Sequence, residues 1–466
     1  MNTIPIEKFN QFVLHALEGR SAANTLASFV LKADDSLMIQ KVKKLSLDYE
    51  KSFYWEIPDK NTRMLALGEL ISVSENGKGR FAAIEKRIKL IKENFVSNWH
   101  EYEDVSIPLF VGGMKFTSEN ESEVWENYSD SNWFAPKILI LSEGSDVYII
   151  YNFLLSSDSL KEKLKNEFEL KISSLFSPKE NHNPTSKPQI QSIAGNTPKD
   201  KKKWMESVKK VISLIEAGEL KKVVLSRCLE LKLNEEPYIY DLLEQLKQNY
   251  PGCYLFAFHS GKSTFFGASP EKLVRMNEEW VEADALAGSA PRGKDELEDK
   301  MFEEQLLKSN KDLHEHNTVV SYIGSLFSGF SKHIDYDSVP KIKKLKNIQH
   351  LWTPVRVKLS TDHKIFNIME CLHPTPAVCG IPQIEALNTI KKIEDYHRGM
   401  YAGIIGWFNF NKEGEFAVAI RSALLKGKKL YAFAGGGIVE GSDPALEYKE
   451  TELKLRPILA LFNNEN

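Results

Sequence analysis

Residues Phe433 to Pro457 read FAGGGIVEGSDPALEYKETELKLRP, and the rest of the chain can be organised around them. The stretch begins as a strand and passes through glycines at 435–437, where backbone amides can approach a ligand closely because no Cβ intervenes. It then turns into a helix, for which Asp443 is a suitable N-cap and Pro444 a suitable first residue. We therefore predict a strand, a glycine-lined turn and a helix in immediate succession.

The predicted helix carries Glu447 and Glu450 three residues apart, so both carboxylates lie on one face, with Lys454 one turn further along the same side. Like charges at this spacing repel by roughly 0.2–0.5 kcal/mol when solvated. A divalent cation such as Mg²⁺, which binds one or two carboxylates plus ligand oxygens, would relieve the repulsion. A solvated acidic face at a helix start is the alternative, and for an isolated cluster it is the commoner case. The preceding glycine run favours the metal.

The composition is that of an ordinary globular protein, with 466 residues, 42% of them hydrophobic and 27% charged, and a net charge of −3. Without a strong basic excess, no nucleic-acid partner is expected. The N-terminus lacks a basic segment followed by an apolar one, and no apolar run approaches the length that spans a membrane, so no membrane association is expected. The cysteines show no CxxC spacing, which indicates reduced thiols in a cytoplasmic protein; they are Cys228, Cys253, Cys371 and Cys379.

The first half of the chain is predicted to combine strands with a few helices. Apolar spacing predicts helices at 6–17, 80–95 and 159–176. Alternation predicts strands at 28–33, 52–58, 63–73, 107–116, 136–143 and 147–153. Residues 177–201, rich in Pro, Asn, Ser and Lys, form the clearest linker. We place a boundary there, which divides the chain into 1–195 and 196–466.

The second half opens with a helix signalled by Thr197 as N-cap, Pro198 at the first position and Asp200 closing a capping box. Further helices are predicted at 238–250 and, as one long helix, at 301–327. Strands are predicted at 221–233, 253–260, 263–269, 280–288, 350–359, 401–410, 415–425 and 430–436. The order has no regular βαβ alternation. It favours an α+β layered architecture over a Rossmann sheet.

Several other side chains could take part in chemistry, although each has an ordinary structural interpretation. Lys222 opens an alternating strand, where lysine is usually a solvated edge residue. Glu271 follows a proline, which favours the first turn of a helix. Glu315 lies in the triplet HEH, a poor metal motif because adjacent helical residues do not share a face. His373, in a proline-rich turn, serves a structural hydrogen bond equally well. Arg421 interrupts an apolar strand, and a buried arginine needs an anion such as a carboxylate.

Taken together, a series of motifs resembles the chorismate-utilising enzyme family, which includes anthranilate synthase component I, and specifically its isochorismate synthase branch. The motifs occur in the order KVVLSR, GASPEKLV, ALAGSAPRG, HEH, LHPTPAVCG, YAGIIGWF, AIRSALL and GGGIVEGSDPALEYKET. The resemblance is continuous over about residues 198–460 and weaker before them, where FYWEIPD, LALGE and IPLFVGGMKF are similar. It implies one large four-layer α/β/β/α sandwich to which both halves contribute.

The resemblance implies a role for each candidate residue. Lys222 matches the general base that activates water, and Glu271 matches the general acid that protonates the departing hydroxyl. The metal ligands around Mg²⁺ are implied to be Glu315, Glu447 and Glu450. The positions that match substrate-binding residues are Gly288, Ser289 (usually threonine in relatives), His373 (its role left open), Tyr401, Arg421, Gly435, Gly436, Gly437 and Lys454.

These roles are physically consistent. Chorismate is a dianion that three glutamates alone would repel, whereas Mg²⁺ reverses the local sign and Arg421 offers a bidentate partner. Lys222 can accept a proton only as the neutral amine, which desolvation or a nearby cation would favour. Glu271 must start protonated, which requires a raised pKa.

Two positions narrow the choice among the activities of this family. Relatives that use ammonia typically carry glutamine at the position of Lys222, and aminodeoxychorismate synthases carry lysine at that of Ala287, so water is the expected nucleophile here. The resemblance implies a monomeric, Mg²⁺-dependent isomerase (hydroxymutase) without a glutaminase subunit, which makes isochorismate for menaquinone or siderophore biosynthesis. A salicylate synthase is the alternative, because it shares Lys222, Glu271 and the three acids. A non-catalytic chorismate-binding protein would require the loss of a catalytic group, and none is missing.

Overall fold

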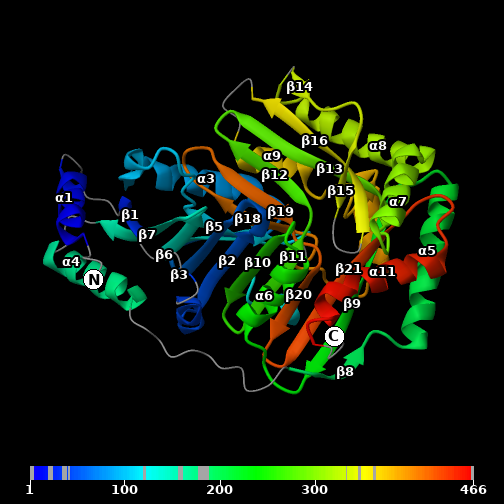
Figure 1. Cartoon of the computed structure of the whole chain (residues 1–466), viewed down its shortest axis with the longest axis horizontal. Helices are drawn as coiled ribbons and strands as arrows, with labels where there is room; N and C mark the ends of the chain where they lie inside the picture. Colours follow the sequence, from blue (N-terminus) through cyan, green and yellow to red (C-terminus); the bar gives the residue numbers. More distant parts are fainter. Residues whose placement is uncertain are drawn as a thin grey trace.

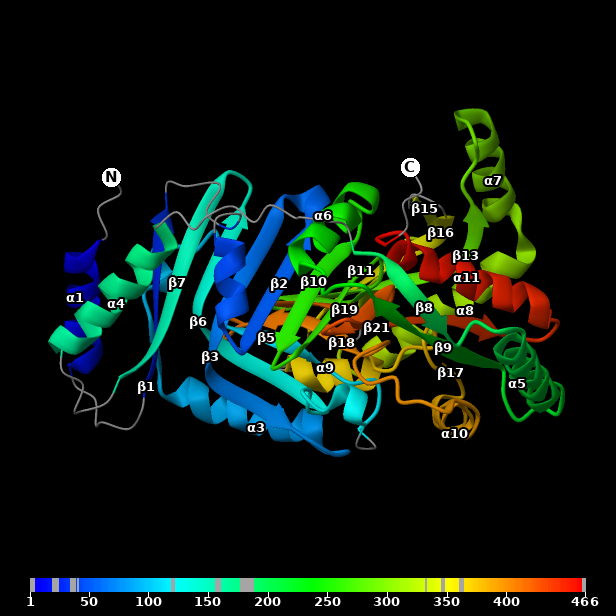
Figure 2. The same ribbon diagram turned by 90° about the horizontal axis from the view of Figure 1, so that it is seen from below.

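The computed structural model describes residues 5–18, 25–33, 39, 42–118, 122–155, 161–176, 188–331, 333–344, 348–359 and 364–462. The strands form a branched sheet in two layers (Figures 1 and 2). The layers separate at β6 (Ser131–Glu143). One edge of β6 pairs with β3 (Thr62–Glu75), whereas its other edge pairs first with β5 (Phe110–Met114) and then with β7 (Asp146–Leu155).

The first layer continues from both edges of β6. On one side lie β7, β1 (Thr25–Ala33) and β4 (Phe95–Ser97). On the other side the order is β3, β2 (Lys51–Ile57), β10 (Tyr254–Ser260), β11 (Ser263–Ser269), β20 (Ser422–Lys426), β21 (Lys429–Ile438) and β9 (Lys222–Leu233). The far edge of β9 pairs with β17 (Gly380–Ile381) near its start and with β8 (Ile190–Ala194) near its end. Only β1 and β4 run parallel among these pairs.

The second layer follows β5. Its order is β5, β18 (Ile404–Phe408), β19 (Gly414–Val418), β12 (Lys272–Asn277), β13 (Trp280–Pro291) and β16 (Ile348–Lys358). The edge of β16 carries β14 (Ile334–Asp335) and β15 (Lys341–Lys344). The pairs β2–β10 and β5–β18 join strands from 1–195 to strands from 196–466. Both layers therefore contain both ranges, and the division between the ranges stays a prediction about the sequence.

Alternate residues of the strands face two different apolar cores. Phe53 and Trp55 of β2 share one core with Phe408 and Phe416 of the second layer, whereas Tyr54 belongs to the other core. This period of two is what a strand buried on both faces requires. The first core lies between the layers and extends under helices that pack on the second layer, whereas the second core lies under helices on the outer face of the first layer. The predicted α/β/β/α sandwich is confirmed.

Helices cover the outside of both layers. The first layer is covered by α1 (Ile6–Leu17), α4 (Lys161–Phe176), α6 (Ile239–Asn249) and α11 (Pro444–Leu459). Helices on the second-layer side are α3 (Arg80–Glu93), α7 (Glu296–Lys308), α8 (Asn310–Phe327) and α9 (Ile365–Leu372). Beside β9 lie α5 (Pro198–Glu216) and α10 (Gln383–Ile393). Helices α1 and α4 lie together at one end of the molecule and α5 lies at the other (Figures 1 and 2). No helix within the described ranges has the length and apolar character needed to cross a membrane.

Two predicted elements are in fact interrupted. The single helix predicted at 301–327 is two helices, because Ser309 is extended (φ −72°, ψ 107°) and its side chain caps α8 by accepting a hydrogen bond from the N–H of Asp312. The strand predicted at 415–425 is split into β19 and β20, because Arg421 has φ 51°, in the left-handed region. The spacing of apolar residues does not indicate where a single residue with a different backbone conformation interrupts a helix or strand.

Two further local predictions were wrong. Residues 190–194, placed in the linker, form β8 and pair with the end of β9; residues 177–187 of that linker lie outside the described residues. Glu271, for which the preceding proline favoured a helix, instead leads into strand β12. There the edge of β19 supplies a sheet partner, and tertiary pairing overrides the local preference of the proline.

Candidate active site

Strands β9 and β21 place the glycine run beside Lys222. Gly437 pairs with Val224, two residues along β9 from Lys222. A Cβ added at Gly437 would lie 3.0 Å from Lys222 Cε, and one added at Gly435 would lie 3.1 Å from the Tyr401 hydroxyl. Both distances are tighter than nearly all real Cβ contacts. Glycine is therefore needed here to admit two polar side chains. Binding of substrate by the glycine amides stays a prediction.

Lys222 forms an ion pair with Glu315. The pair joins the start of β9 to α8, with Lys222 Nζ 3.2 Å from Glu315 Oε1. The lysine side chain is 13% exposed and the glutamate side chain 37% exposed, so the acid lies at the wetter end of the contact. The neighbouring His316 is buried and bonds through Nε2 to Thr353 Oγ1 at 2.8 Å, which is a structural role and agrees with the rejection of HEH as a metal motif.

Helix α11 begins as predicted and presents its acids towards the glycines. Asp443 accepts hydrogen bonds from the N–H groups of the second and third helical residues, as an N-cap does. One turn later, Glu447 accepts a hydrogen bond of 2.8 Å from Ser442 Oγ through Oε1. Its other oxygen, Oε2, is buried and has no hydrogen-bond partner in the described part of the chain. Burial and the charge of Glu450 raise the pKa of Glu447.

Glu450 is paired with Lys454 in the next turn of the helix. Glu450 Oε1 lies 2.6 Å from Lys454 Nζ, and the same ammonium group donates to the carbonyl oxygen of Gly435 at 3.0 Å. Burial alone would raise the pKa of Glu450, but the ion pair with Lys454 and the charges of Arg421 and Lys222 lower it below its usual value. Lys454 therefore ties α11 to the glycine strand and keeps Glu450 ionised.

The three predicted metal ligands have the right donor chemistry. Glu315, Glu447 and Glu450 offer carboxylate oxygens, the ligands that Mg²⁺ prefers. Among the described residues no group of three or more His, Cys, Asp or Glu side chains is arranged to hold a metal ion. Glu315 and Glu450 each face a lysine instead. The buried, partnerless Oε2 of Glu447 is the feature that fits a cation, since buried polar atoms are normally satisfied. Mg²⁺ binding stays a prediction.

Glu271 is a buried carboxyl surrounded by charges from four other elements. It is 8% exposed and stands between β11 and β12, with its backbone N–H 3.2 Å from Ser269 Oγ. Burial raises the pKa of Glu271 to about 7, against the lowering effect of Lys222, Lys343 and Lys454, whereas Asp284 adds to the rise. The carboxyl can therefore be protonated near neutral pH, which is what a general acid requires.

Arg421 and Tyr401 are placed to receive an anionic ligand. Arg421 stands between β19 and β20, and within the described residues no carboxylate pairs with its guanidinium. Burial lowers the pKa of Arg421. Tyr401 is 4% exposed and its ring stacks on Phe433 with centroids 5.2 Å apart. A half-buried arginine without a protein counter-ion fits a bidentate carboxylate from a ligand.

The bulge between β13 and β16 brings a further histidine to the site. Gly288, with φ 75°, occupies the bulge, and the next residue, Ser289, bonds through Oγ to His350 Nδ1 at 2.8 Å. Burial, together with the charges of Arg421 and Lys454, lowers the pKa of His350 to about 3, so His350 is neutral at pH 7. Sequence reasoning missed His350, because a lone histidine in an apolar strand gives no signal until β13 and β16 are paired.

His373 points elsewhere. Its Nε2 bonds to the carbonyl oxygen of Phe116 at 3.1 Å, and its ring meets the Phe116 ring edge to face with centroids 6.2 Å apart. Burial and the charge of Arg80 lower the pKa of His373 to about 3. These contacts support the structural interpretation of this histidine. Its predicted role in substrate binding stays untested.

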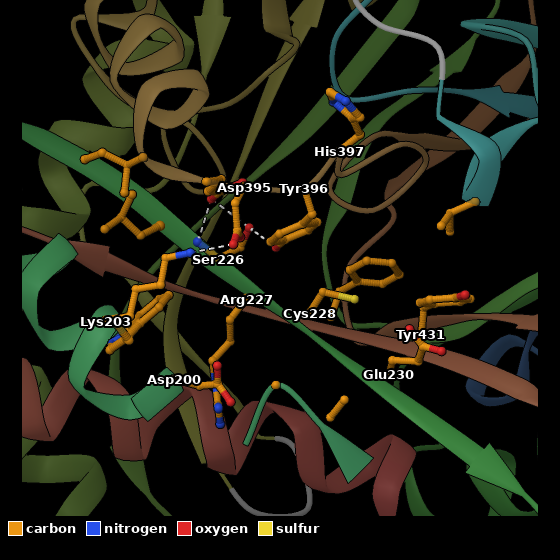
Figure 3. A pocket seen from close by; sticks show the side chains of 18 of the residues that line it. Asp200, Lys203, Ser226, Arg227, Cys228, Glu230, Asp395, Tyr396, His397 and Tyr431 are labelled. Atoms are coloured by element: carbon orange, nitrogen blue, oxygen red, sulfur yellow. Dashed lines mark hydrogen bonds and ion pairs between the residues drawn. The ribbon is translucent and has the colours of Figure 1, made fainter. Parts of the chain in front are cut away.

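A separate cavity of about 510 Å³ opens at the free edge of β9 between β17 and β8 (Figure 3). None of the predicted site residues lines it. Two of its acids are paired with cations: Lys203 Nζ lies 2.5 Å from Asp395 Oδ2, and Glu394 pairs with Arg398. The cavity is therefore not part of the cluster that Lys222 and the glutamates form.

Comparisons with known proteins show the family of the chain. The family model for the chorismate binding enzymes matches residues 11–463. The isochorismate synthase MenF of Bacillus subtilis is 31% identical over 98% of this chain and 98% of its own length. The salicylate biosynthesis isochorismate synthase of Pseudomonas aeruginosa is 34% identical over 86% of this chain and 83% of its own. The structure of MenF, the menaquinone-specific isochorismate synthase of Escherichia coli, matches 97% of this chain and 98% of that chain with a TM-score of 0.76 at 22% identity, which shows the same fold. With its fold, its motifs and a family match over nearly its whole length, the chain belongs to the chorismate binding enzyme family.

Proposed function

We propose that this protein is an isochorismate synthase, an isomerase of the hydroxymutase type that converts chorismate to isochorismate with Mg²⁺ as cofactor. The full-length similarity to the Bacillus subtilis isochorismate synthase supports the activity. The observation that carries the proposal is the electrostatic coupling of Lys222 to a buried carboxyl, Glu271, whose pKa burial raises to about 7. A potential base and a potential acid thus face one site, as the addition of water and the loss of a hydroxyl require.

The proton transfers follow from those two groups. Lys222, as the neutral amine, takes a proton from water while the water oxygen bonds to C2 of chorismate. The C1=C2 electron pair moves to C1–C6, and the C5=C6 pair moves to C4–C5. The C4–O bond breaks, and Glu271 gives its proton to the departing oxygen. One water enters and one leaves, so the atoms balance.

Other residues of the site bind and orient the dianion. Arg421, which has no carboxylate partner among the described residues, can hold one substrate carboxylate through two hydrogen bonds. The Tyr401 hydroxyl beside Gly435 offers another donor. Mg²⁺ held by Glu315, Glu447 and Glu450 would neutralise these acids and polarise the carboxylate of the substrate ring. The same ion would compete with Lys222 for the Glu315 carboxylate, which forms an ion pair with Lys222 in this structure.

The product serves menaquinone or siderophore biosynthesis in this proposal, and the protein acts as a cytoplasmic monomer. A salicylate synthase, which would also eliminate pyruvate, is the alternative activity. The Pseudomonas aeruginosa relative named for salicylate biosynthesis is itself an isochorismate synthase, which favours the first activity. Analysis of the product formed from chorismate, with pyruvate measured in parallel, separates the two.

A further inference from the structure

Lys343 reaches from the edge of the second layer to the residue next to Glu271. Its Nζ donates a hydrogen bond of 2.9 Å to the carbonyl oxygen of Pro270. The same atom lies 3.6 Å from Asp284 Oδ2, and the side chain is only 23% exposed. Ordering a lysine side chain costs conformational entropy, so a lysine held in one position needs contacts that offset this cost. The partners here are the turn that carries Glu271 and an acid that faces Glu271.

Strand pairing points Lys343 into the site. Lys343 lies opposite His350 in the β15–β16 pair, and residues directly opposite share one face of a sheet. His350 bonds to Ser289 on that face. Lys343 therefore approaches the same region as the predicted substrate-binding residues, although no motif in the sequence marks it.

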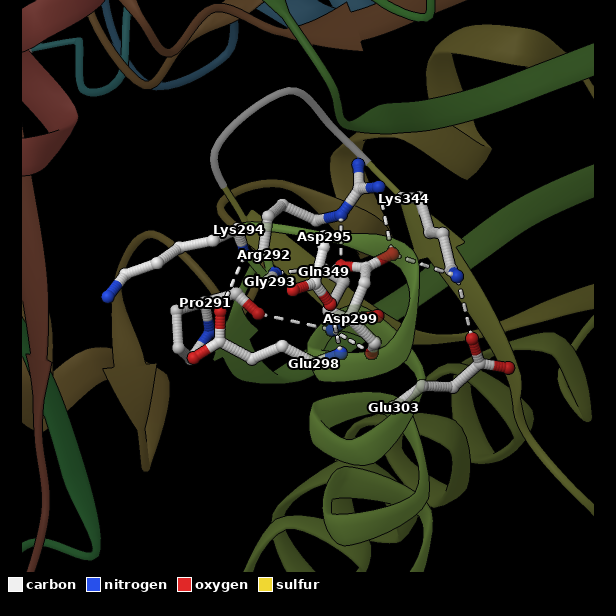
Figure 4. A network of polar contacts seen from close by, with 10 residues as sticks. All are labelled: Pro291, Arg292, Gly293, Lys294, Asp295, Glu298, Asp299, Glu303, Lys344 and Gln349. Carbon is white, nitrogen blue, oxygen red and sulfur yellow. Dashed lines mark hydrogen bonds and ion pairs between the residues drawn. The ribbon is translucent and has the colours of Figure 1, made fainter.

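The other face of β15 is anchored to α7 (Figure 4). Lys344 Nζ lies 3.1 Å from Asp299 Oδ2 and 2.7 Å from Glu303 Oε2. Asp299 also accepts hydrogen bonds from Arg292 Nε at 2.6 Å and from the N–H of Gly293 at 3.0 Å. These hydrogen bonds hold the pKa of Asp299 well below its usual value, so it remains ionised. The network fixes the strand from which Lys343 extends.

The charges with the largest effect on Glu271 among the described residues come from four elements, and the buried Tyr401 hydroxyl is also coupled to this carboxyl. Lys222 of β9, Lys343 of β15 and Lys454 of α11 lower the pKa of Glu271, and Asp284 of β13 raises it. Lys343 therefore acts on Glu271 both through the Pro270 carbonyl and by offsetting the charge of Asp284.

We propose that Lys343 is a positioning residue, which holds the Pro270 turn so that the Glu271 carboxyl is aimed at the departing hydroxyl. The proposal rests on the proposed function for the role of Glu271 as general acid. Without Lys343, the turn loses a hydrogen bond and Asp284 loses a neighbouring cation, although it keeps its ion pair with Lys272 at 3.0 Å. A shift of the acid by about 1 Å can cost roughly 10²-fold in rate.

The test uses three variants of the full chain. Lys343→Met removes the charge and the hydrogen-bond donor but keeps an unbranched side chain only one atom shorter, whereas Lys343→Arg keeps the charge and the donor. Lys341→Met is the matched control, because Lys341 lies on the same strand with its side chain 61% exposed and paired with Asp337. We expect Lys343→Met to lower kcat by about 10²-fold with a much smaller change in KM, Lys343→Arg to recover part of the loss, and the control to match the wild type. If the methionine variant does not fold, Lys343→Gln takes its place.

The high-pH limb of the kcat profile should also move. Because Glu271 must be protonated and Lys343 lowers its pKa, losing Lys343 should move this limb to higher pH. A rise in KM with unchanged kcat would overturn the proposal and make Lys343 a residue that only attracts the dianion. An unshifted profile would also overturn it.

An infrared titration without substrate separates this proposal from the proposed function. The protonated carboxyl band of Glu271 is identified by its absence in Glu271→Gln. It should titrate at higher pH in Lys343→Met than in the wild type. If the two proteins titrate alike, the action of Lys343 on Glu271 is refuted whatever the reaction is. If the band shifts but the wild type makes no isochorismate, the proposed function fails and the contact of Lys343 with Glu271 stands.

Discussion

Lys222 Nζ lies 3.2 Å from Glu315 Oε1, so the proposed base and one of the proposed metal ligands are each other's counter-ions. The same arrangement recurs on α11, where Lys454 Nζ lies 2.6 Å from Glu450 Oε1. Any cation that binds the acids must compete with these two lysines. Metal binding at these acids should therefore weaken both ion pairs.

Adding Mg²⁺ should raise the melting temperature of the protein, because a ligand that binds only the folded state stabilises it, by about 2.7 kcal/mol at 100 times its Kd. Glu447→Gln should abolish the shift, since Glu447 Oε2 is the buried oxygen without a partner. The metal-free variant should be as stable as the wild type, because the lost charge is repelled by Glu450. Thermal melts in Mg²⁺ and in chelator measure both effects. Glu452→Gln, at an exposed position of the same helix, is the control. An equal Mg²⁺ shift in Glu447→Gln would count against the assignment.

Lys222→Arg should lose about 10²–10⁴-fold in kcat, the usual contribution of general-base catalysis. Arginine keeps the positive charge but cannot accept a proton from water, because its guanidinium does not deprotonate at accessible pH. Chorismate affinity should change far less. Steady-state kinetics of this variant, of Lys222→Gln and of the control Lys221→Arg, at an exposed neighbouring position, provide the test. Near wild-type turnover in Lys222→Arg would mean that Lys222 acts only as a charge.

Glu271 should impose a pH dependence on activity and on stability. As a general acid it must be protonated, so kcat/KM should fall as pH rises through about 7, the value to which burial raises its pKa. Glu271→Gln should lose about 10²–10⁴-fold in rate.

The raised pKa of Glu271 also determines how this residue changes the stability of the protein with pH. The pKa is about 7 in the folded protein against an ordinary value of 4.5, so the stabilising contribution is present below pH 4.5 and lost as pH rises through 7. The melting temperature of the wild type should therefore fall relative to that of Glu271→Gln across this interval. Parallel curves for the two proteins would contradict a buried, protonated carboxyl.

Arg421→Lys should raise KM by about 10- to 100-fold, the equivalent of one hydrogen bond to a charged group at about 1.5–3 kcal/mol. Lysine keeps the charge but cannot form two parallel hydrogen bonds to a carboxylate. The melting temperature should change little, because no carboxylate of the described residues pairs with Arg421. Arg275→Lys, at an exposed position of β12, controls for the substitution itself. A variant that melts much lower with an unchanged KM would make Arg421 a structural residue.

Most of the fold could be predicted from local patterns. The apolar spacing at 6–17 and the capping box of Thr197 with Asp200 both mark helices that the structure contains. The patterns failed at Ser309 and Arg421, where single residues with special backbone conformations interrupt a continuous apolar pattern. The alternation within each strand also says nothing about which strand lies beside it.

The site was harder to derive than the fold, because its members come from distant parts of the chain. Lys222 and Glu315 are 93 residues apart and meet only after β9 and α8 have packed. Taken singly, each has an ordinary surface interpretation, and only the ordered motifs pointed to their roles. His350 and Lys343 carried no such signal. They become candidates once β16 is paired on both edges.

The most direct test of the proposed function is to identify what the purified protein makes from chorismate, with Mg²⁺ and with excess chelator. Chromatography and NMR of the product, with pyruvate measured in the same samples, give the answer. We predict isochorismate in Mg²⁺, little pyruvate, and loss of activity in chelator. Pyruvate released in step with chorismate consumption, or full activity in excess chelator, would contradict the proposed function.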